Sequence, residues 1–133
     1  MLFRSGGAFA GGTLARDVVT LSKLGCAANE PLELLPAIKR SNDWHRGWAF
    51  RCLQSRLGQL SGKRIAVLGL TYTPNTNTLR RSAAIELCRA LIDAGALVNA
   101  FDPVVKELPT ELGRVAVVES VAEAVALADA VVP

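Results

Sequence analysis

The sequence has no run of hydrophobic residues long enough to cross a membrane, although half of its 133 residues are hydrophobic. A membrane-spanning helix needs about 20 consecutive apolar residues. The start of the chain also has no long apolar run of the kind that marks a secretory signal peptide. We therefore expect a protein without a membrane partner, with enough apolar side chains to build a folded core.

Cysteine and histidine are also scarce. Cys26, Cys52 and Cys88 are spaced neither as a C-x-x-C pair nor as another set of metal ligands, and His45 is the single histidine. An odd number of cysteines argues against a disulfide framework, which is typical of small secreted domains. This pattern predicts a cytoplasmic protein with reduced thiols and without a metal site.

Charge of one sign is limited as well. The 15 lysines and arginines and the 12 acidic residues give a net charge of +3, and no run of like charges is long. Scattered arginines do not form the basic patch that nucleic acid requires. The charge pattern therefore disfavours a nucleic-acid partner.

What is present is a strand–helix–strand pattern. Residues 65–70 are apolar throughout, residues 82–94 have a helical pattern that ends at Gly95, and residues 97–101 form a second apolar strand. Strands that are apolar on both faces are typical of a parallel sheet covered by helices, with a right-handed crossover between neighbouring strands. The predicted fold class is therefore α/β, of the doubly wound type.

Helical patterns precede this unit and short elements follow it. Helical periodicity runs from Leu14 to Gly25, where the glycine is expected to end the helix, and again over residues 32–57. A final apolar stretch stops after three residues, which predicts a chain truncated within a sheet. Three later elements are expected: a strand at residues 115–118, a helix at residues 120–128 and a strand at residues 130–132.

The second helical pattern carries polar residues on its apolar side, at Asn42 and His45. A buried polar group without a partner costs about 1–3 kcal/mol. One interpretation is that the helix bends near Gly47 and leaves both side chains in water. The other is that the apolar side opens there onto a ligand or a partner helix. Both interpretations stay open.

The connection TYTPNTNTLRR, residues 71–81, is the candidate binding site that the residues themselves indicate. Doubly wound sheets bind ligands at the carboxyl ends of their strands, and the start of the next helix favours an anion. Arg80 and Arg81 add positive charge suited to phosphate, with Ser82 as the helix N-cap. An ordinary solvated loop is the alternative, although about eleven residues is long against the usual two to six.

This connection is not a dinucleotide fingerprint. Only Gly69 is present, without the second and third glycines of G-x-G-x-x-G. Asp102 ends the second strand, as a ribose-binding acid would. Because the fingerprint is missing, we interpret Asp102-Pro103 as a turn instead.

Three stretches carry a family resemblance. The glycine-rich RSGGAFAGGTLARD is by itself either a flexible start or a backbone that a ligand can approach closely, and it resembles a loop usually written GGSCFPKD. SNDWH resembles an N-x-x-Q segment, and GKRIAVLGLTYTPNTNTLRRSAA resembles a domain opening whose second strand ends in Y-D-P, here AFDP. In this order and spacing they are similar to the UDP-glucose/GDP-mannose dehydrogenase family.

The resemblance implies a domain organisation. Residues 1–60 would be the central helical, dimer-forming segment, and residues 61–133 a Rossmann-like UDP-binding domain truncated at its C-terminus. In such enzymes a separate domain holds NAD, and the sugar's primary alcohol is oxidised to a carboxylate through a cysteine-bound thiohemiacetal. We therefore expect a fragment of an NAD-dependent UDP-sugar dehydrogenase that forms a homodimer, binds a UDP-sugar and does not turn over alone.

The resemblance also implies site residues. Thr13 stands at the position of the nucleophilic cysteine, and Asp17 matches the aspartate that assists water or proton handling. Arg16 and Arg80 match residues that contact the cofactor. The residues implied to bind the nucleotide sugar are Leu2, Phe3, Arg4, Phe9, Gly11, Asn42, Tyr72 and Thr73.

Two departures from the family pattern bear on activity. A thiol is readily tuned to a thiolate at neutral pH, whereas the hydroxyl of Thr13 would need a dedicated base beside it. Thr73 replaces the substrate-binding lysine of the family. Two alternatives to the enzyme fragment therefore remain: a catalytically degenerate module that dimerises or binds a UDP-sugar, and an unrelated small α/β protein.

Overall fold

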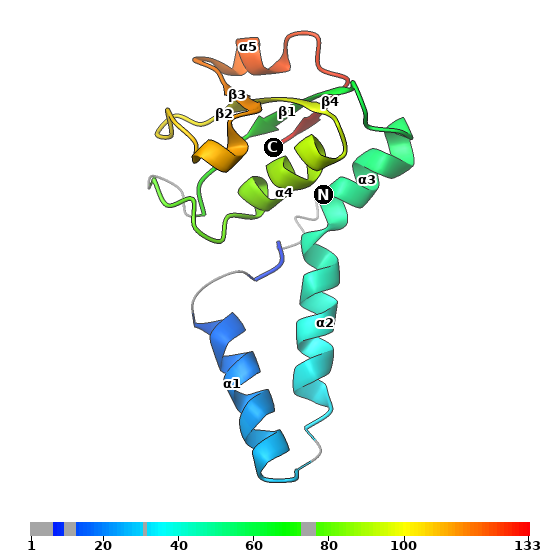
Figure 1. The fold of residues 1–133 in the computed structure, drawn as a ribbon, viewed down its shortest axis with the longest axis vertical. Helices are drawn as coiled ribbons and strands as arrows, with labels where there is room; N and C mark the ends of the chain where they lie inside the picture. Colours follow the sequence, from blue (N-terminus) through cyan, green and yellow to red (C-terminus); the bar gives the residue numbers. More distant parts are fainter. Residues whose placement is uncertain (1–6, 10–12, 31, 73–76) are drawn as a thin grey trace, which may run out of the picture. The chain divides into compact units, whose positions relative to one another are not determined.

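The computed structural model describes residues 7–9, 13–30, 32–72 and 77–133. The chain forms two compact units, Met1–Trp48 and Ala49–Pro133 (Figure 1). The first unit is helical and the second is α/β. The first unit ends at Trp48, and the division into domains at residues 1–60 and 61–133 stays a prediction.

The first unit contains two helices that lie side by side, α1 (Leu14–Ala27) and α2 (Leu34–Arg46). The expectation that Gly25 ends the first helix is wrong, because α1 continues to Ala27. Gly25 is buried, and a Cβ at this position would overlap the side chain of Leu32. The glycine therefore serves close packing rather than helix termination.

The single helix expected over residues 32–57 is interrupted at Gly47. α2 ends at Arg46, Gly47 is its C-cap, and α3 (Trp48–Leu57) begins at the next residue. Glycine has a low helix propensity, so a break at this residue agrees with the bend that the sequence left open. The sequence therefore indicated the position of the bend, but it did not predict that two separate helices meet there.

In the second unit four parallel strands form one sheet in the order β3-β2-β1-β4. β1 is shorter than predicted, because the chain turns at Gly69 with φ +89°. The other strands lie where the sequence placed them, with β3 one residue shorter than predicted. The strand bounds are Arg64–Leu68 (β1), Leu97–Phe101 (β2), Val115–Val117 (β3) and Ala130–Val132 (β4).

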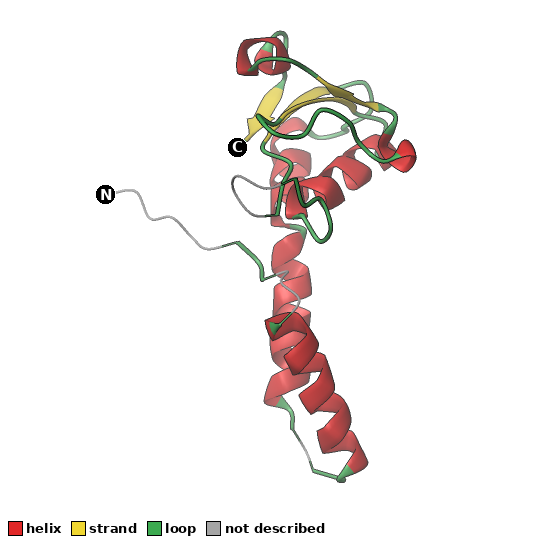
Figure 2. Ribbon diagram, turned by 90° about the vertical axis from the view of Figure 1, so that its left-hand side faces the viewer, coloured by secondary structure: helices red, strands yellow, loops and turns green. Residues whose placement is uncertain are grey.

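Helices cover both faces of this sheet. α4 (Ala83–Asp93), the crossover between β1 and β2, lies on one face, and the short α5 (Val121–Val125) lies on the other (Figures 1 and 2). Ile65, Ala66 and Val67 of central strand β1 are at most 1% exposed, as expected for a strand covered on both sides. The predicted α/β fold is thus confirmed. The largest fully buried side chains include Ile65, Leu70, Leu91 and Leu112.

The turn between α4 and β2 depends on Gly95. Its φ is +79°, its N–H donates to Ile92 O at 3.1 Å, and the Ala96 N–H donates to Leu91 O at 3.0 Å. These two bonds are the pair of a Schellman C-cap, which requires a left-handed residue. A Cβ on Gly95 would also lie 3.1 Å from Ser61 Oγ.

Gly95→Ala is therefore expected to lower the free energy of unfolding by about 1–2 kcal/mol, because alanine is strained at positive φ. Urea denaturation followed by circular dichroism measures this loss. Gly95→Asn is the graded control, since asparagine adopts the left-handed region more readily and should lose less. Equal stability of the wild type and Gly95→Ala would contradict the strain argument.

Candidate functional site

The connection from β1 to α4 begins at the carboxyl end of β1, as the sequence predicted. The Gly69 N–H donates to Phe101 O at 2.8 Å and so extends the pairing of β1 with β2 past the strand end. Leu70 is then fully buried, and the Tyr72 N–H donates to Thr78 O at 2.8 Å. The two ends of the loop are thus drawn together, and Tyr72 itself is 45% exposed.

The loop ends at a capped helix start. Ser82 is buried, its N–H donates to Leu79 O at 3.1 Å, and its Oγ accepts a long bond of 3.5 Å from Ile85 N–H. This confirms Ser82 as the N-cap of α4. Arg80 is exposed beside this helix start, and Arg81 follows with φ +66°. A non-glycine residue at positive φ next to a helix N-terminus is a strained position of the kind found at functional sites.

Asp102, at the end of β2, makes the turn that the sequence indicated. Its carboxylate accepts hydrogen bonds from the N–H groups of Val104 and Val105, and also from those of Leu70 and Thr71. Burial alone would raise the pKa of Asp102, but these four backbone donors outweigh burial and hold the pKa below its ordinary value. Asp102 is therefore ionised in the folded protein at neutral pH.

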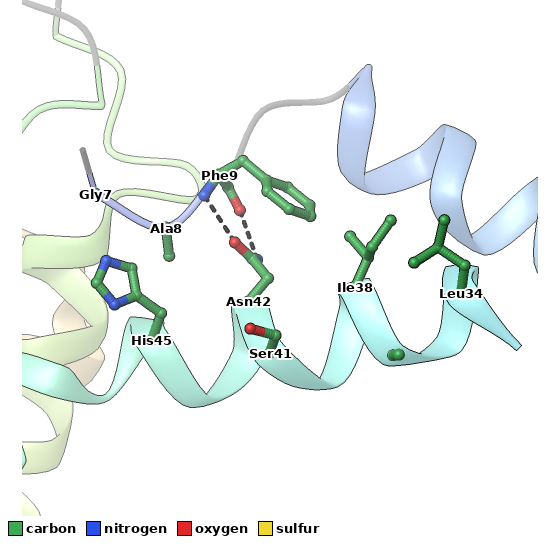
Figure 3. Close-up of a pocket in the computed structure, with 9 residues that line it drawn as sticks. Gly7, Ala8, Phe9, Leu34, Ile38, Ser41, Asn42 and His45 are labelled. Atoms are coloured by element: carbon green, nitrogen blue, oxygen red, sulfur yellow. Dashed lines mark hydrogen bonds between the residues drawn. The ribbon is translucent and has the colours of Figure 1, made fainter. Parts of the chain in front are cut away.

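A separate pocket of about 500 Å³ lies in the first unit, between the segment 7–9 and α2 (Figure 3). The side-chain amide of Asn42 clamps this segment: Oδ1 accepts from Phe9 N–H at 2.8 Å, and Nδ2 donates to Phe9 O at 2.9 Å. The polar residue on the apolar side of the helix is thus neither in water nor left without a partner. The residues that line the pocket are Gly7, Ala8, Phe9, Leu34, Ala37, Ile38, Ser41, Asn42 and His45.

The start of α1 brings together three predicted site residues. Thr13 is the exposed N-cap residue, and its side chain makes no capping bond. The Asp17 N–H donates to Thr13 O at 2.8 Å, and Arg16 Nε lies 3.5 Å from Asp17 Oδ1. Both side chains of this ion pair are well exposed, so it contributes little stability. The arrangement leaves the hydroxyl of Thr13 accessible.

Two of the three thiols, Cys26 and Cys88, are poorly suited to act in place of a nucleophile at Thr13. Cys26 lies in the last turn of α1, roughly 20 Å along the helix from Thr13 at 1.5 Å per residue. Burial raises the pKa of the Cys88 thiol to about 11, so this group stays protonated at neutral pH.

Some of the predicted residues are placed near one another and others are not described. Phe9 is bonded to Asn42, while Tyr72 and Arg80 belong to one connection. The domain assignments and the roles given to all these residues stay predictions. The predicted site residues outside the described part of the chain are Leu2, Phe3, Arg4, Gly11 and Thr73.

The described residues do not form a dinucleotide site, a metal site or a membrane span. The pyrophosphate of NAD needs several glycines between strand and helix, so that the backbone can approach it closely. The connection after β1 does not fit this requirement, because Gly69 is its single described glycine and a serine, Ser82, stands at the helix start. In the described ranges no group of three or more His, Cys, Asp or Glu side chains could hold a metal ion. None of the described helices has the length and apolar character to span a bilayer.

The sequence of the second unit matches a family model. The UDP-binding domain model of the UDP-glucose/GDP-mannose dehydrogenase family matches residues 66–133, from β1 to β4. The chain belongs to this family. The resemblance drawn from the three sequence stretches is thereby confirmed.

Curated members of the family are similar over most of this chain. The UDP-glucose 6-dehydrogenase AglM of Haloferax volcanii is 37% identical over 135 residues, which covers 96% of this chain and 31% of AglM. The UDP-glucose 6-dehydrogenase TuaD of Bacillus subtilis is 32% identical over 101 residues, covering 76% of this chain and 22% of TuaD. The chain thus spans 22–31% of the length of these relatives.

Solved structures of the family share the fold. A UDP-glucose dehydrogenase from Pyrobaculum islandicum has a TM-score of 0.78 at 27% identity, over 92% of this chain and 29% of that protein. A ternary complex of GDP-mannose dehydrogenase from Pseudomonas aeruginosa has a TM-score of 0.75 at 27% identity, over 96% of this chain and 31% of that protein. The similarity therefore includes the helical unit as well as the sheet.

Proposed function

We propose that the second unit binds the diphosphate of a UDP-sugar in the connection between β1 and α4. The observation that carries this proposal is the capped N-terminus of α4 at the carboxyl edge of the sheet, with Arg80 exposed beside it. Free N–H groups and the helix dipole favour an anion there, and a guanidinium matches phosphate geometry. The match to a UDP-binding domain model supports the same ligand.

The whole protein is proposed to be an NAD-dependent dehydrogenase of the UDP-glucose 6-dehydrogenase kind. It would oxidise the primary alcohol of the sugar toward a uronate, and Phe9 and Asn42 in the pocket of the first unit are proposed to contact the nucleotide sugar. NAD binding would need residues other than the connection after β1. The chain of 133 residues is therefore expected to bind UDP without turning over a UDP-sugar.

A second function is favoured by one specific residue. Thr13 presents an exposed residue where the family has a cysteine, and the one thiol of α1, Cys26, lies in the last turn of the helix. A family member without the thiolate would serve as a dimerising or UDP-sugar-binding module without the cysteine-dependent step. Turnover of UDP-glucose with NAD by the whole protein would exclude this second function.

The first unit is proposed to form a homodimer. Of its described residues, only Val18 and Gly25 are buried, and α2 has no buried residue. Two helices without a core of their own need another surface to cover their apolar side chains. Leu14, Leu21 and Leu24 of α1 are each 48% exposed or more.

α2 carries the face that suits a second copy of the chain. Leu34, Ala37, Ser41 and Trp44 follow the spacing i, i+3, i+7, i+10, which places them on one side of the helix as in a coiled-coil seam. Leu34 is 70% exposed and Trp44 is 69% exposed. Because three of these residues also line the pocket, a partner helix on this seam would cover part of the pocket mouth.

Calorimetry with UDP tests the binding proposal. The wild-type chain is expected to bind UDP and not NAD, and Arg80→Ala should weaken UDP binding about tenfold or more, because a hydrogen bond to a charged group contributes about 1.5–3 kcal/mol. Arg114→Ala is the matched control. It removes the same charge from an exposed residue just before β3, at the amino edge of the sheet, and should leave affinity within about twofold. Absence of UDP binding by the wild type would contradict the proposal.

A further inference from the structure

One buried carboxylate joins two segments at the edge of the sheet where the ligand is proposed to bind. Asp102 is 3% exposed. Its Oδ2 accepts from Leu70 N–H at 2.7 Å and from Thr71 N–H at 3.3 Å, where the chain leaves β1. Its Oδ1 accepts from Val104 N–H at 2.8 Å and from Val105 N–H at 3.1 Å, where the chain leaves β2.

The chemistry of these bonds requires an ionised carboxylate at residue 102. An ionised carboxylate only accepts hydrogen bonds, and here each oxygen faces two N–H donors. An amide would turn its own NH₂ group toward one of the two pairs of donors. Bonds to a charged acceptor are also about twice as strong as neutral ones. Asn at this position therefore keeps the shape of the side chain and loses half of its acceptors.

These bonds fix the point at which the connection between β1 and α4 leaves the sheet. Leu70 is the last residue before this connection and Thr71 is its first, and the Tyr72 N–H closes the connection by donating to Thr78 O. The other end of the loop is held by Ser82 at the start of α4. The loop is thus anchored at its beginning by Asp102 and at its end by the helix cap.

We propose that Asp102 is a positioning residue for the UDP-binding loop. By holding the exit of β1 against the exit of β2, its carboxylate sets where Thr71 and Tyr72 lie at the start of the connection. Asp102 has no unused lone pair pointing to a ligand in this role and acts through the backbone of the loop. The inference rests on the proposed function for its ligand, but its structural part is independent of UDP.

The test compares Asp102→Asn with a matched variant, Asp129→Asn. Asp129 is also a carboxylate that accepts a backbone bond, from Arg64 N–H at 2.8 Å, but it stands at the amino edge of the sheet before β4. Amide hydrogen exchange at Tyr72 and Ser82 is the first readout, because their own hydrogen bonds do not involve Asp102. Affinity for UDP by calorimetry is the second, with both measured where circular dichroism shows the variants folded.

Asp102→Asn is expected to speed exchange at Tyr72 and Ser82 about tenfold and to weaken UDP binding about tenfold, whereas Asp129→Asn changes both by less than about twofold. Asp102→Glu keeps the charge and should recover part of the affinity. If Asp102→Asn does not fold, Asp102→Glu is measured in its place and is expected to lose about threefold in UDP affinity, since its oxygens are displaced by one methylene.

If the Tyr72 and Ser82 amides of Asp102→Asn exchange as slowly as those of the wild type, the inference is overturned. Equal effects of Asp102→Asn and Asp129→Asn would overturn it as well, because a general loss of stability would then explain both. A wild-type chain that binds no UDP would contradict the proposed function, and the exchange rates would still decide the role of Asp102.

Discussion

Trp44→Glu is expected to convert the proposed homodimer into a monomer. Trp44 is 69% exposed on the seam of α2, and large aromatic residues contribute most of the binding free energy at interfaces. A carboxylate placed there would have to be buried without a partner, so the dissociation constant should rise about a hundredfold or more. Sedimentation velocity at micromolar concentration measures the change.

The control for this variant is Asp43→Ala, on the opposite side of α2. Asp43 is exposed and forms an i,i+4 ion pair with Lys39, which contributes only about 0.3–0.5 kcal/mol. Its loss should leave the dimer intact. A wild-type chain that sediments as a monomer would show that something other than a second copy covers the apolar side chains of α1 and α2. A dimer that persists in Trp44→Glu would place the interface on a different face.

The elements that the sequence predicted well have local signals. The apolar run of β1, the N-cap Ser82 and the stop at Gly95 each depend on residues within a few positions along the chain. Their physical causes, burial on both faces, a capping hydroxyl and a left-handed glycine, act over the same short range. The sheet could therefore be predicted strand by strand from the sequence.

Features that depend on distant partners could not be predicted in this way. Glycine is a common helix stop, so the sequence alone suggests that role for Gly25. In the structure the Leu32 side chain instead occupies the space that a Cβ on Gly25 would fill. The sequence allows two interpretations of Asn42, a solvated side chain or a contact with a ligand or partner helix, whereas the structure shows a bond to the backbone of Phe9. Its partner, Phe9, lies 33 residues earlier in the chain, and no local pattern indicates that pairing.

Asp102 combines both cases in one side chain. The Asp-Pro dipeptide indicates a turn, and the bonds to Val104 and Val105 are within that turn. The bonds to Leu70 and Thr71 cross 32 and 31 residues of sequence and follow from the register of β1 beside β2. The sequence therefore explained half of the hydrogen bonds and missed the half that reaches the candidate site.

Asn42→Ala is expected to release the segment that forms one wall of the pocket. The substitution removes both hydrogen bonds to the backbone of Phe9, each of which contributes about 0.5–1.5 kcal/mol. Exchange of the Phe9 amide hydrogen should therefore become about tenfold faster or more. Nuclear magnetic resonance of the labelled chain measures this rate directly.

Two further variants separate the clamp from a general effect on the pocket. Ser41→Ala changes a neighbouring residue of the pocket wall and should leave the exchange of the Phe9 amide unchanged. Asn42→Asp keeps an acceptor for the Phe9 N–H and turns a carboxylate oxygen toward Phe9 O, so its exchange rate should be intermediate. If Phe9 contacts the nucleotide sugar, as proposed, loss of the clamp should weaken UDP-glucose binding more than UDP binding. Equal losses for the two ligands would mean that the pocket does not hold the sugar.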